Sequence, residues 1–95
     1  MLTVIIYDIE ETNNRNHLIK KLRHFGLNRI QKSVFSGYLD KSSRKKLQEY
    51  TKENIQSDKD SIIHLEICHS CQKTIIIQGE NRLPSEDNKE YGVLL

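Results

Sequence analysis

Asp8 has the type and position of a candidate catalytic or metal-binding residue, because it directly follows the apolar run 2–7 and precedes Ile9. An unpaired carboxylate is costly to bury. At the end of a strand it is therefore either a turn residue or a ligand for a cation. Oxygen ligands near basic residues and hydroxyl groups suit a Mg²⁺-dependent phosphodiester reaction, in which the metal neutralises charge on the phosphate. Both interpretations of Asp8 stay open at this point.

One carboxylate is a small ligand set, since magnesium typically takes one or two carboxylates together with water and substrate oxygens. Glu10 and Glu11 are close in sequence, but Glu10 shares the strand face of Asp8 only if the strand continues. A symmetric dimer would supply a second ligand if the first strands of two chains met near a two-fold axis. The shortage of ligands therefore favours a homodimer in which each chain gives one Asp8.

The sequence Cys68-His69-Ser70-Cys71 is a second candidate centre, with His64 close by. A structural zinc site usually needs a second pair of ligands, and residues 72–95 contain neither Cys nor His. A redox motif would open a helix after a strand, but the next predicted strand begins two residues after Cys71. The sequence favours a tight connection that carries two reduced thiols.

The bulk composition describes one small folded domain. The 95 residues are 36% hydrophobic and 29% charged, which is ordinary for a globular protein. A chain of this length buries a modest core, so a homodimer is a reasonable expectation. No segment approaches the roughly 20 apolar residues of a membrane span, and we see no secretion signal. We therefore expect a cytoplasmic protein with no membrane partner and with reduced cysteines.

The net charge of +2 hides an uneven distribution along the chain. Residues 1–11 carry −3, residues 12–56 carry +8 and residues 57–95 carry −3. A basic middle between acidic ends favours a polyanion-binding face, although a solvated helical surface gives the same pattern. Four basic residues gather at the start of a predicted helix: Lys41, Arg44, Lys45 and Lys46. They oppose the helix dipole, a small cost that would be offset if the helix start faced phosphate.

Hydrophobic periodicity divides the chain into strands and helices. The predicted elements are strands at 2–9, 29–39, 61–68 and 73–79, and helices at 15–25 and 42–56. The alternation is blurred around Val34 and Phe35, which indicates a bulge or bend, and Gly37 fits that interpretation. Residues 80–90 are polar and hold the only proline, whereas residues 91–95 are apolar and must dock on their own sheet or a partner's. We therefore predict a domain over 1–79, followed at 80–95 by a linker and a docking strand.

Several of these segments together resemble the small CRISPR-associated endonuclease family, the second universal adaptation protein and partner of the spacer integrase. The motifs that carry the resemblance are Tyr7-Asp8-Ile9 at the end of the first strand, Arg15 at the opening of the first helix, Gly26-Leu27 at its end, and Arg29 to Gly37. They cover residues 1–39, and the remainder agrees in length and pattern.

The resemblance implies a fold and an assembly. The fold is an α+β ferredoxin-like sandwich, in which an antiparallel sheet carries two helices on one face. The assembly is a tight homodimer, and in this family the C-terminal strand often adds to the partner's sheet. The predicted elements include only one strand between the two helices, whereas this fold has two. Either the bend near Val34 splits that segment, or the strand order differs.

The resemblance also implies an activity, metal-dependent phosphodiester cleavage of RNA or DNA. Asp8 of both chains would be the catalytic residue and the ligand of Mg²⁺ or Mn²⁺. Arg15, Arg29 and Phe35 match positions linked to activity or substrate contact, and Tyr7 precedes the aspartate as in the family. Each has a plainer interpretation as well: Arg15 as a surface residue, Arg29 as the partner of an acid, and Phe35 as core.

Two functions fit this resemblance, and the choice between RNA and DNA is open in both. The first is an endonuclease that acts in spacer acquisition. The second is a dimeric scaffold without chemistry of its own, which holds duplex DNA for the spacer integrase through contacts to backbone phosphate. The residues expected to bind nucleic acid are Arg15, Arg29, Lys41, Arg44, Lys45 and Lys46. An mRNA-cutting toxin of similar fold is a weaker relative of the first function.

Overall fold

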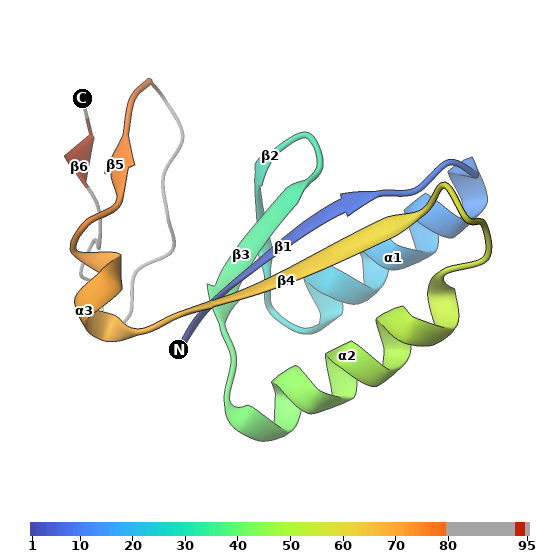
Figure 1. Cartoon of the computed structure of the whole chain (residues 1–95), viewed down its shortest axis with the longest axis horizontal. Coiled ribbons are helices and arrows are strands. Elements are labelled where there is room, and N and C mark those ends of the chain that lie inside the picture. Colours follow the sequence, from blue (N-terminus) through green and yellow to red (C-terminus); the bar gives the residue numbers. More distant parts are fainter. Residues whose placement is uncertain (80–92, 95) are drawn as a thin grey trace.

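A computed structural model describes residues 1–79 and 93–94 of the chain. Four strands form an antiparallel sheet in the order β2-β3-β1-β4, and α1 and α2 cover one face of it (Figure 1). The elements in chain order are β1 (Leu2–Asp8), α1 (Thr12–His24), β2 (Asn28–Gln31), β3 (Val34–Tyr38), α2 (Lys41–Asn54), β4 (Ser61–Ile67), α3 (His69–Gln72), β5 (Ile76–Ile77) and β6 (Val93–Leu94). The first six elements have the βαββαβ order of a ferredoxin-like fold, as the resemblance implied.

The central strand β1 determines which residues reach the core. Successive side chains of a strand point to opposite faces of the sheet. Ile5 and Tyr7 point towards the helices and pack with Phe35, which lies opposite Ile5 in β3. Leu18 and Leu22 of α1 and Leu47 of α2 complete this core from the other side and are fully buried.

We call the other side of the sheet the open face, because neither α1 nor α2 covers it (Figure 1). By strand alternation and register it carries Leu2, Val4, Ile6, Asp8, Val34, Ser36, Tyr38, Ser61, Ile63, Leu65 and Ile67. The strand predicted at 61–68 is confirmed as β4, and its side chains Ile63, Leu65 and Ile67 lie on the open face. Ile63 is 49% exposed and Leu65 is 42% exposed, whereas the half-buried His64 points towards the helices.

The segment predicted as one strand at 29–39 is two strands, so the bend does split it. Residues Lys32 and Ser33 form the turn between β2 and β3, and the register shifts between Arg29 and Gln31. Gly37 does not mark the bend, since it lies within β3 and is buried. A Cβ at this position would lie 2.7 Å from Cδ2 of Leu27 and 3.2 Å from the carbonyl oxygen of Gly26. Gly37 therefore allows the turn after α1 to approach the sheet closely.

Both long helices are capped by acids that precede them. Glu11 is the N-cap of α1, so this helix begins earlier than the predicted residue 15. Asp40 is the N-cap of α2, where its carboxylate accepts a hydrogen bond of 2.7 Å from the backbone N–H of Ser43. That bond is the main cause of the lowered pKa of Asp40.

The chain after β4 differs from the prediction. The strand expected at 73–79 is wrong: the short helix α3 follows β4, and only Ile76–Ile77 are extended as β5. Figure 1 shows β5 beside β6 and apart from the four-stranded sheet, and the two strands pair in parallel. The predicted linker at 80–90 lies outside the described residues, and addition of the C-terminal strand to a partner's sheet stays a prediction. Within the described residues, no helix is long and apolar enough to cross a membrane.

Candidate metal and nucleic-acid site

Asp8 is the last residue of β1, opposite Ser61 of β4, and its side chain is exposed on the open face. Among residues 1–79 and 93–94, nothing hydrogen-bonds to its carboxylate or forms an ion pair with it. A turn or capping aspartate would accept a backbone hydrogen bond. Asp8 accepts none, so its oxygens are available to a ligand from outside the chain.

Glu10 and Glu11 do not join Asp8 in a ligand cluster. The Glu11 carboxylate accepts hydrogen bonds from the backbone N–H groups of Asn13 (3.0 Å) and Asn14 (2.6 Å) at the start of α1. The Glu10 carboxylate lies 3.9 Å from Nζ of Lys59, and its backbone N–H donates to Asp60. Within the described part of the chain, no group of three or more Asp, Glu, His or Cys side chains could hold a metal ion.

Tyr7 and Arg29 are linked on the helix-covered face, next to Asp8 in the chain. Tyr7 is 3% exposed. Its hydroxyl donates to the carbonyl oxygen of Lys32 at 3.2 Å and accepts from Nη2 of Arg29 at 3.4 Å. Phe35 is fully buried, which agrees with its interpretation as core. The guanidinium of Arg29 lies over the Phe35 ring, 5.3 Å from the ring centroid.

Arg23 is a second arginine beside Phe35, and it was not predicted from the sequence. Its guanidinium lies 5.8 Å from the centroid of the Phe35 ring. The buried Phe35 ring therefore makes cation–π contacts with two guanidinium groups, those of Arg23 and Arg29. Arg23 and Arg29 line an open pocket together with Gly26, Leu27 and Asn28. None of the described residues that line this pocket is acidic, and its charge therefore suits an anion such as a phosphate.

Arg15 lies at the Asp8 end of the sheet. Its guanidinium donates to the carbonyl oxygen of Ile9 at 3.1 Å and to the hydroxyl of Thr12 at 3.2 Å. Arg15 and Arg29 therefore contact the two sequence neighbours of Asp8: Arg15 contacts Ile9, and Arg29 contacts Tyr7. The structure does not place Asp8 and both arginines on one face of the sheet, because Tyr7 and Asp8 point in opposite directions.

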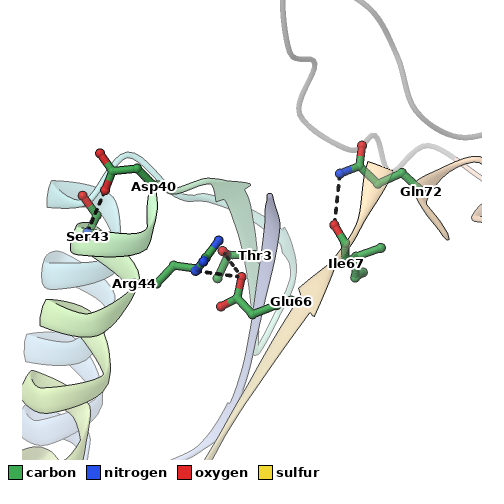
Figure 2. A network of polar contacts seen from close by, with 7 residues as sticks. All are labelled: Thr3, Asp40, Ser43, Arg44, Glu66, Ile67 and Gln72. Carbon is green, nitrogen blue, oxygen red and sulfur yellow. Dashed lines mark hydrogen bonds and ion pairs between the residues drawn. The ribbon is translucent and has the colours of Figure 1, made fainter. Parts of the chain in front are cut away.

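The basic residues at the start of α2 lie at the far end of the sheet from Asp8. Figure 2 shows Arg44 reaching Glu66, whose carboxylate lies 3.5 Å from Nε of Arg44 and accepts a 2.8 Å hydrogen bond from Thr3. Thr3 precedes Asp8 by roughly 17 Å of strand. Arg44 thus fastens α2 to the sheet, while Lys41, Lys45 and Lys46 are exposed.

The donor set fits a hard divalent cation to a limited extent. Among the described strand residues, the open face offers one exposed carboxylate, that of Asp8, and oxygen ligands are those that Mg²⁺ and Mn²⁺ prefer. A second carboxylate would have to come from another copy of the chain. The fit therefore depends on assembly through the open face.

Fold and site together define a class: a ferredoxin-like α+β protein with a free carboxylate at the end of its first strand and arginines around a buried phenylalanine. The chain belongs to the Cas2 family, since the sequence profile described as CRISPR associated protein Cas2 matches residues 1–75. This confirms the resemblance on which the expectations of fold and activity were based.

Two relatives match almost the whole chain. A protein of Archaeoglobus fulgidus is 35% identical over 93 residues, covering 98% of this chain and 97% of the relative. A protein of Methanospirillum hungatei is 31% identical over 91 residues, covering 96% and 94%. Both carry the name CRISPR-associated endoribonuclease Cas2 1.

Solved structures support the same fold. Streptococcus pyogenes Cas2 superposes with a TM-score of 0.67 at 20% identity, covering 79% of this chain and 95% of that one. A structure described as cas2 gives 0.62 at 24% identity, covering 90% and 94%. The hypothetical protein TT1823 from Thermus thermophilus gives 0.64 at 27% identity, covering 70% and 80%.

Proposed function

We propose that this chain is an endonuclease of the CRISPR adaptation module that cleaves RNA, depends on Mg²⁺ or Mn²⁺, and acts as a homodimer with Asp8 as its catalytic residue. The observation that carries the proposal is the exposed, unpartnered carboxylate of Asp8 on the open face. The names of the two near full-length relatives support RNA as the first substrate to test.

Each residue has a defined part in this proposal. Asp8 of the two subunits would hold the divalent cation, which when bound stabilises charge on the phosphate and lowers the pKa of a coordinated water. Arg29 and Arg23 form a cationic surface around Phe35 on which phosphate oxygens bind. Because this surface does not share the Asp8 face of the sheet, it would position the RNA through its backbone phosphates and not contact the cleaved phosphate. The buried Tyr7 orients Arg29 through its hydroxyl.

The homodimer rests on the open face. Ile63 and Leu65 are large apolar residues that remain about half exposed in the single chain. Adjacent exposed apolar side chains on a sheet face are typical of a surface that another protein covers. A second copy related by a two-fold axis would cover them and would bring a second Asp8 to the same surface.

Cleavage by matched variants tests the proposal. In Asp8→Asn the side chain keeps its size and loses its charge, and we expect Mg²⁺-dependent cleavage of single-stranded RNA to fall at least 100-fold. The control is Asp58→Asn, which removes the same charge from an exposed loop position and should leave the rate unchanged. Equal activity of Asp8→Asn and the wild type would overturn the proposal. The same pair assayed on duplex DNA assigns the preferred substrate.

The second candidate function is a DNA-binding scaffold for the spacer integrase, and the position of the lysines at the start of α2 favours it. Lys41, Lys45 and Lys46 are exposed on α2, near the end of the sheet where Arg44 contacts Glu66, so they extend the basic surface beyond a cleavage site at Asp8. If scaffolding is the biological role, Asp8→Asn loses cleavage but still supports spacer acquisition with the integrase.

Charge reversal tests this basic surface. We expect Lys45→Glu to weaken nucleic-acid binding and to lower the slope of log affinity against log salt by about 1, because one phosphate contact is lost. Lys73→Glu makes the same change at an exposed position at the end of α3 and should leave the slope unchanged. Identical slopes for the two variants would place the nucleic-acid surface elsewhere.

A further inference from the structure

Cys68 and Cys71 occupy a position that the nuclease does not use. Cys68 is the N-cap of α3, directly after β4, and Cys71 lies within this short helix. From the sequence, a redox motif was not expected, because a strand was predicted to begin two residues after Cys71. The structure has helix and turn there, and the next strand begins only at Ile76. The motif therefore opens a helix after a strand, as redox-active cysteine pairs do.

Cys68 and Cys71 lie on one helical turn, since the backbone N–H of Gln72 donates to the carbonyl oxygen of Cys68 at 3.0 Å, and their thiols are not equivalent. Sγ of Cys68 lies 3.3 Å from the hydroxyl oxygen of Ser70. Hydrogen bonds from the Ser70 hydroxyl, and then from the backbone N–H and thiol of Cys71, lower the pKa of Cys68 to about 7. The same contact with Cys68 raises the pKa of Cys71. Near neutral pH, Cys68 is therefore partly ionised, whereas Cys71 keeps its proton.

We propose that Cys68 and Cys71 form a redox-active dithiol that reacts with low-molecular-weight disulfides and closes reversibly to an intramolecular disulfide. The Cys68 thiolate attacks one sulfur of the small disulfide, forms a mixed disulfide and releases one small thiolate. Cys71 then loses its proton to solvent and attacks Sγ of Cys68, which releases the second small thiolate. Two protein thiols are oxidised, and one small disulfide is reduced to two thiols.

The pairing of the cysteines explains this order of steps. A thiol whose pKa is close to the ambient pH is the best attacking group, because it is partly ionised and still nucleophilic. Once Cys68 is part of a mixed disulfide, its negative charge is gone. That charge was one cause of the raised pKa of Cys71, so Cys71 can ionise and complete the exchange. Cys71 is exposed and Cys68 is half-buried, so both are open to small reagents.

The helix that carries the thiols is fastened to the sheet. Gln72 is 1% exposed. Its amide donates to the carbonyl oxygen of Ile67 at 3.2 Å (Figure 2) and accepts from the hydroxyl of Tyr38 at 3.2 Å. Gln72 therefore anchors the end of α3, the helix that carries the cysteines, to both β3 and β4. The inference depends on these contacts alone and not on the nuclease proposal.

Mass spectrometry of the full chain treated with glutathione disulfide at pH 7 tests the proposal. We expect the wild type to lose two hydrogen masses and to retain no glutathione. Cys71→Ser should retain one glutathione, because the resolving thiol is missing. Cys68→Ser should react more than 10-fold more slowly than Cys71→Ser. A wild type that accumulates glutathione to the same level as Cys71→Ser would overturn the proposal, and so would equal rates for the two variants.

A second measurement on the wild-type pair does not remove either cysteine. The rate of iodoacetamide alkylation of Cys68, followed by peptide mass, should rise with pH around a midpoint of about 7. Ser70→Ala removes the main stabilising hydroxyl and should move this midpoint upwards. Ser42→Ala, an exposed serine of α2, is the control and should leave it unchanged. A wild-type midpoint near 8.5, the value of an ordinary cysteine, would contradict the proposed reactive thiolate.

Discussion

Asp8, Asp40 and Asp60 all border regular elements, yet their carboxylates have different partners. Asp40 accepts a hydrogen bond from the backbone N–H of Ser43, and Asp60 accepts one from Glu10 at 2.9 Å. Each bond is the largest cause of a lowered pKa for its acid. Asp8 has no such partner within the described residues. This difference separates a free ligand from capping acids, and the sequence alone could not show it.

His64 makes the stability of the fold depend on pH. Burial against α2 lowers the pKa of His64, and the charge of Glu66 opposes this effect without cancelling it. The unfolded chain takes up a proton at this histidine below about pH 6.5, whereas the folded chain takes it up only at lower pH. We therefore expect the free energy of unfolding to fall as the pH drops below about 6.5.

Urea unfolding between pH 5 and pH 8 measures this effect, with His64→Gln as the test. Nε2 of His64 lies 3.1 Å from the hydroxyl of Thr51, and a glutamine can keep a polar contact there without titrating in this range. The variant should lose part of the decline in urea midpoint at acid pH. His17→Gln removes an exposed histidine of α1 and should retain the full decline. Equal pH profiles for the wild type and His64→Gln would contradict the account.

At the scale of elements, the sequence predicted the long segments well. The apolar run 2–7 and the helical spacing of Leu18 and Leu22 placed β1 and α1, because burial of an apolar face determines both. The sequence predicted a bend and not a turn between β2 and β3, because the turn residues Lys32 and Ser33 include neither glycine nor proline. The four residues of α3 are too few to show a helical period.

Only those residues of the candidate site that belong to local sequence motifs could be predicted. Asp8, Arg15 and Arg29 could be named from sequence motifs, but the sequence could not show which face of the sheet each one reaches. Arg23 was missed because its contact with Phe35 joins α1 to β3 and leaves no local pattern. Arg44 was predicted to bind nucleic acid. Its ion pair with Glu66 joins α2 to β4 and could not be predicted from local sequence either.

Gly37→Ala tests the close approach of β3 to the turn after α1. The added Cβ would collide with the buried Leu27 side chain and meet backbone atoms at 3.2 Å. Overpacking of this kind typically costs about 1–3 kcal/mol, which urea unfolding can measure. The double variant Leu27→Ala/Gly37→Ala should show a smaller loss than the sum of the two single changes, because the first substitution removes the collision. Strict additivity would contradict the packing explanation.

At the scale of the whole molecule, the proposed site at Asp8 requires two chains to meet through the open face. Leu65→Arg places a charge among the exposed apolar residues of this face, so we expect the dimer to dissociate. Sedimentation velocity should show the mass of one chain at concentrations where the wild type is dimeric. Gln48→Arg, on an exposed position of α2, is the matched control and should stay dimeric. A Leu65→Arg dimer as stable as the wild type would place the interface elsewhere.

The central claim is that each active site needs Asp8 from two chains, and subunit mixing tests it most directly. Wild-type and Asp8→Asn chains are unfolded together in urea, refolded to exchange subunits, and assayed for Mg²⁺-dependent RNA cleavage at constant total protein. A shared site predicts that activity falls with the square of the wild-type fraction, to about a quarter at equal mixing, because only dimers with two aspartates cleave. A linear decline, to about half at equal mixing, would show that each chain cleaves with its own Asp8 and would contradict the account.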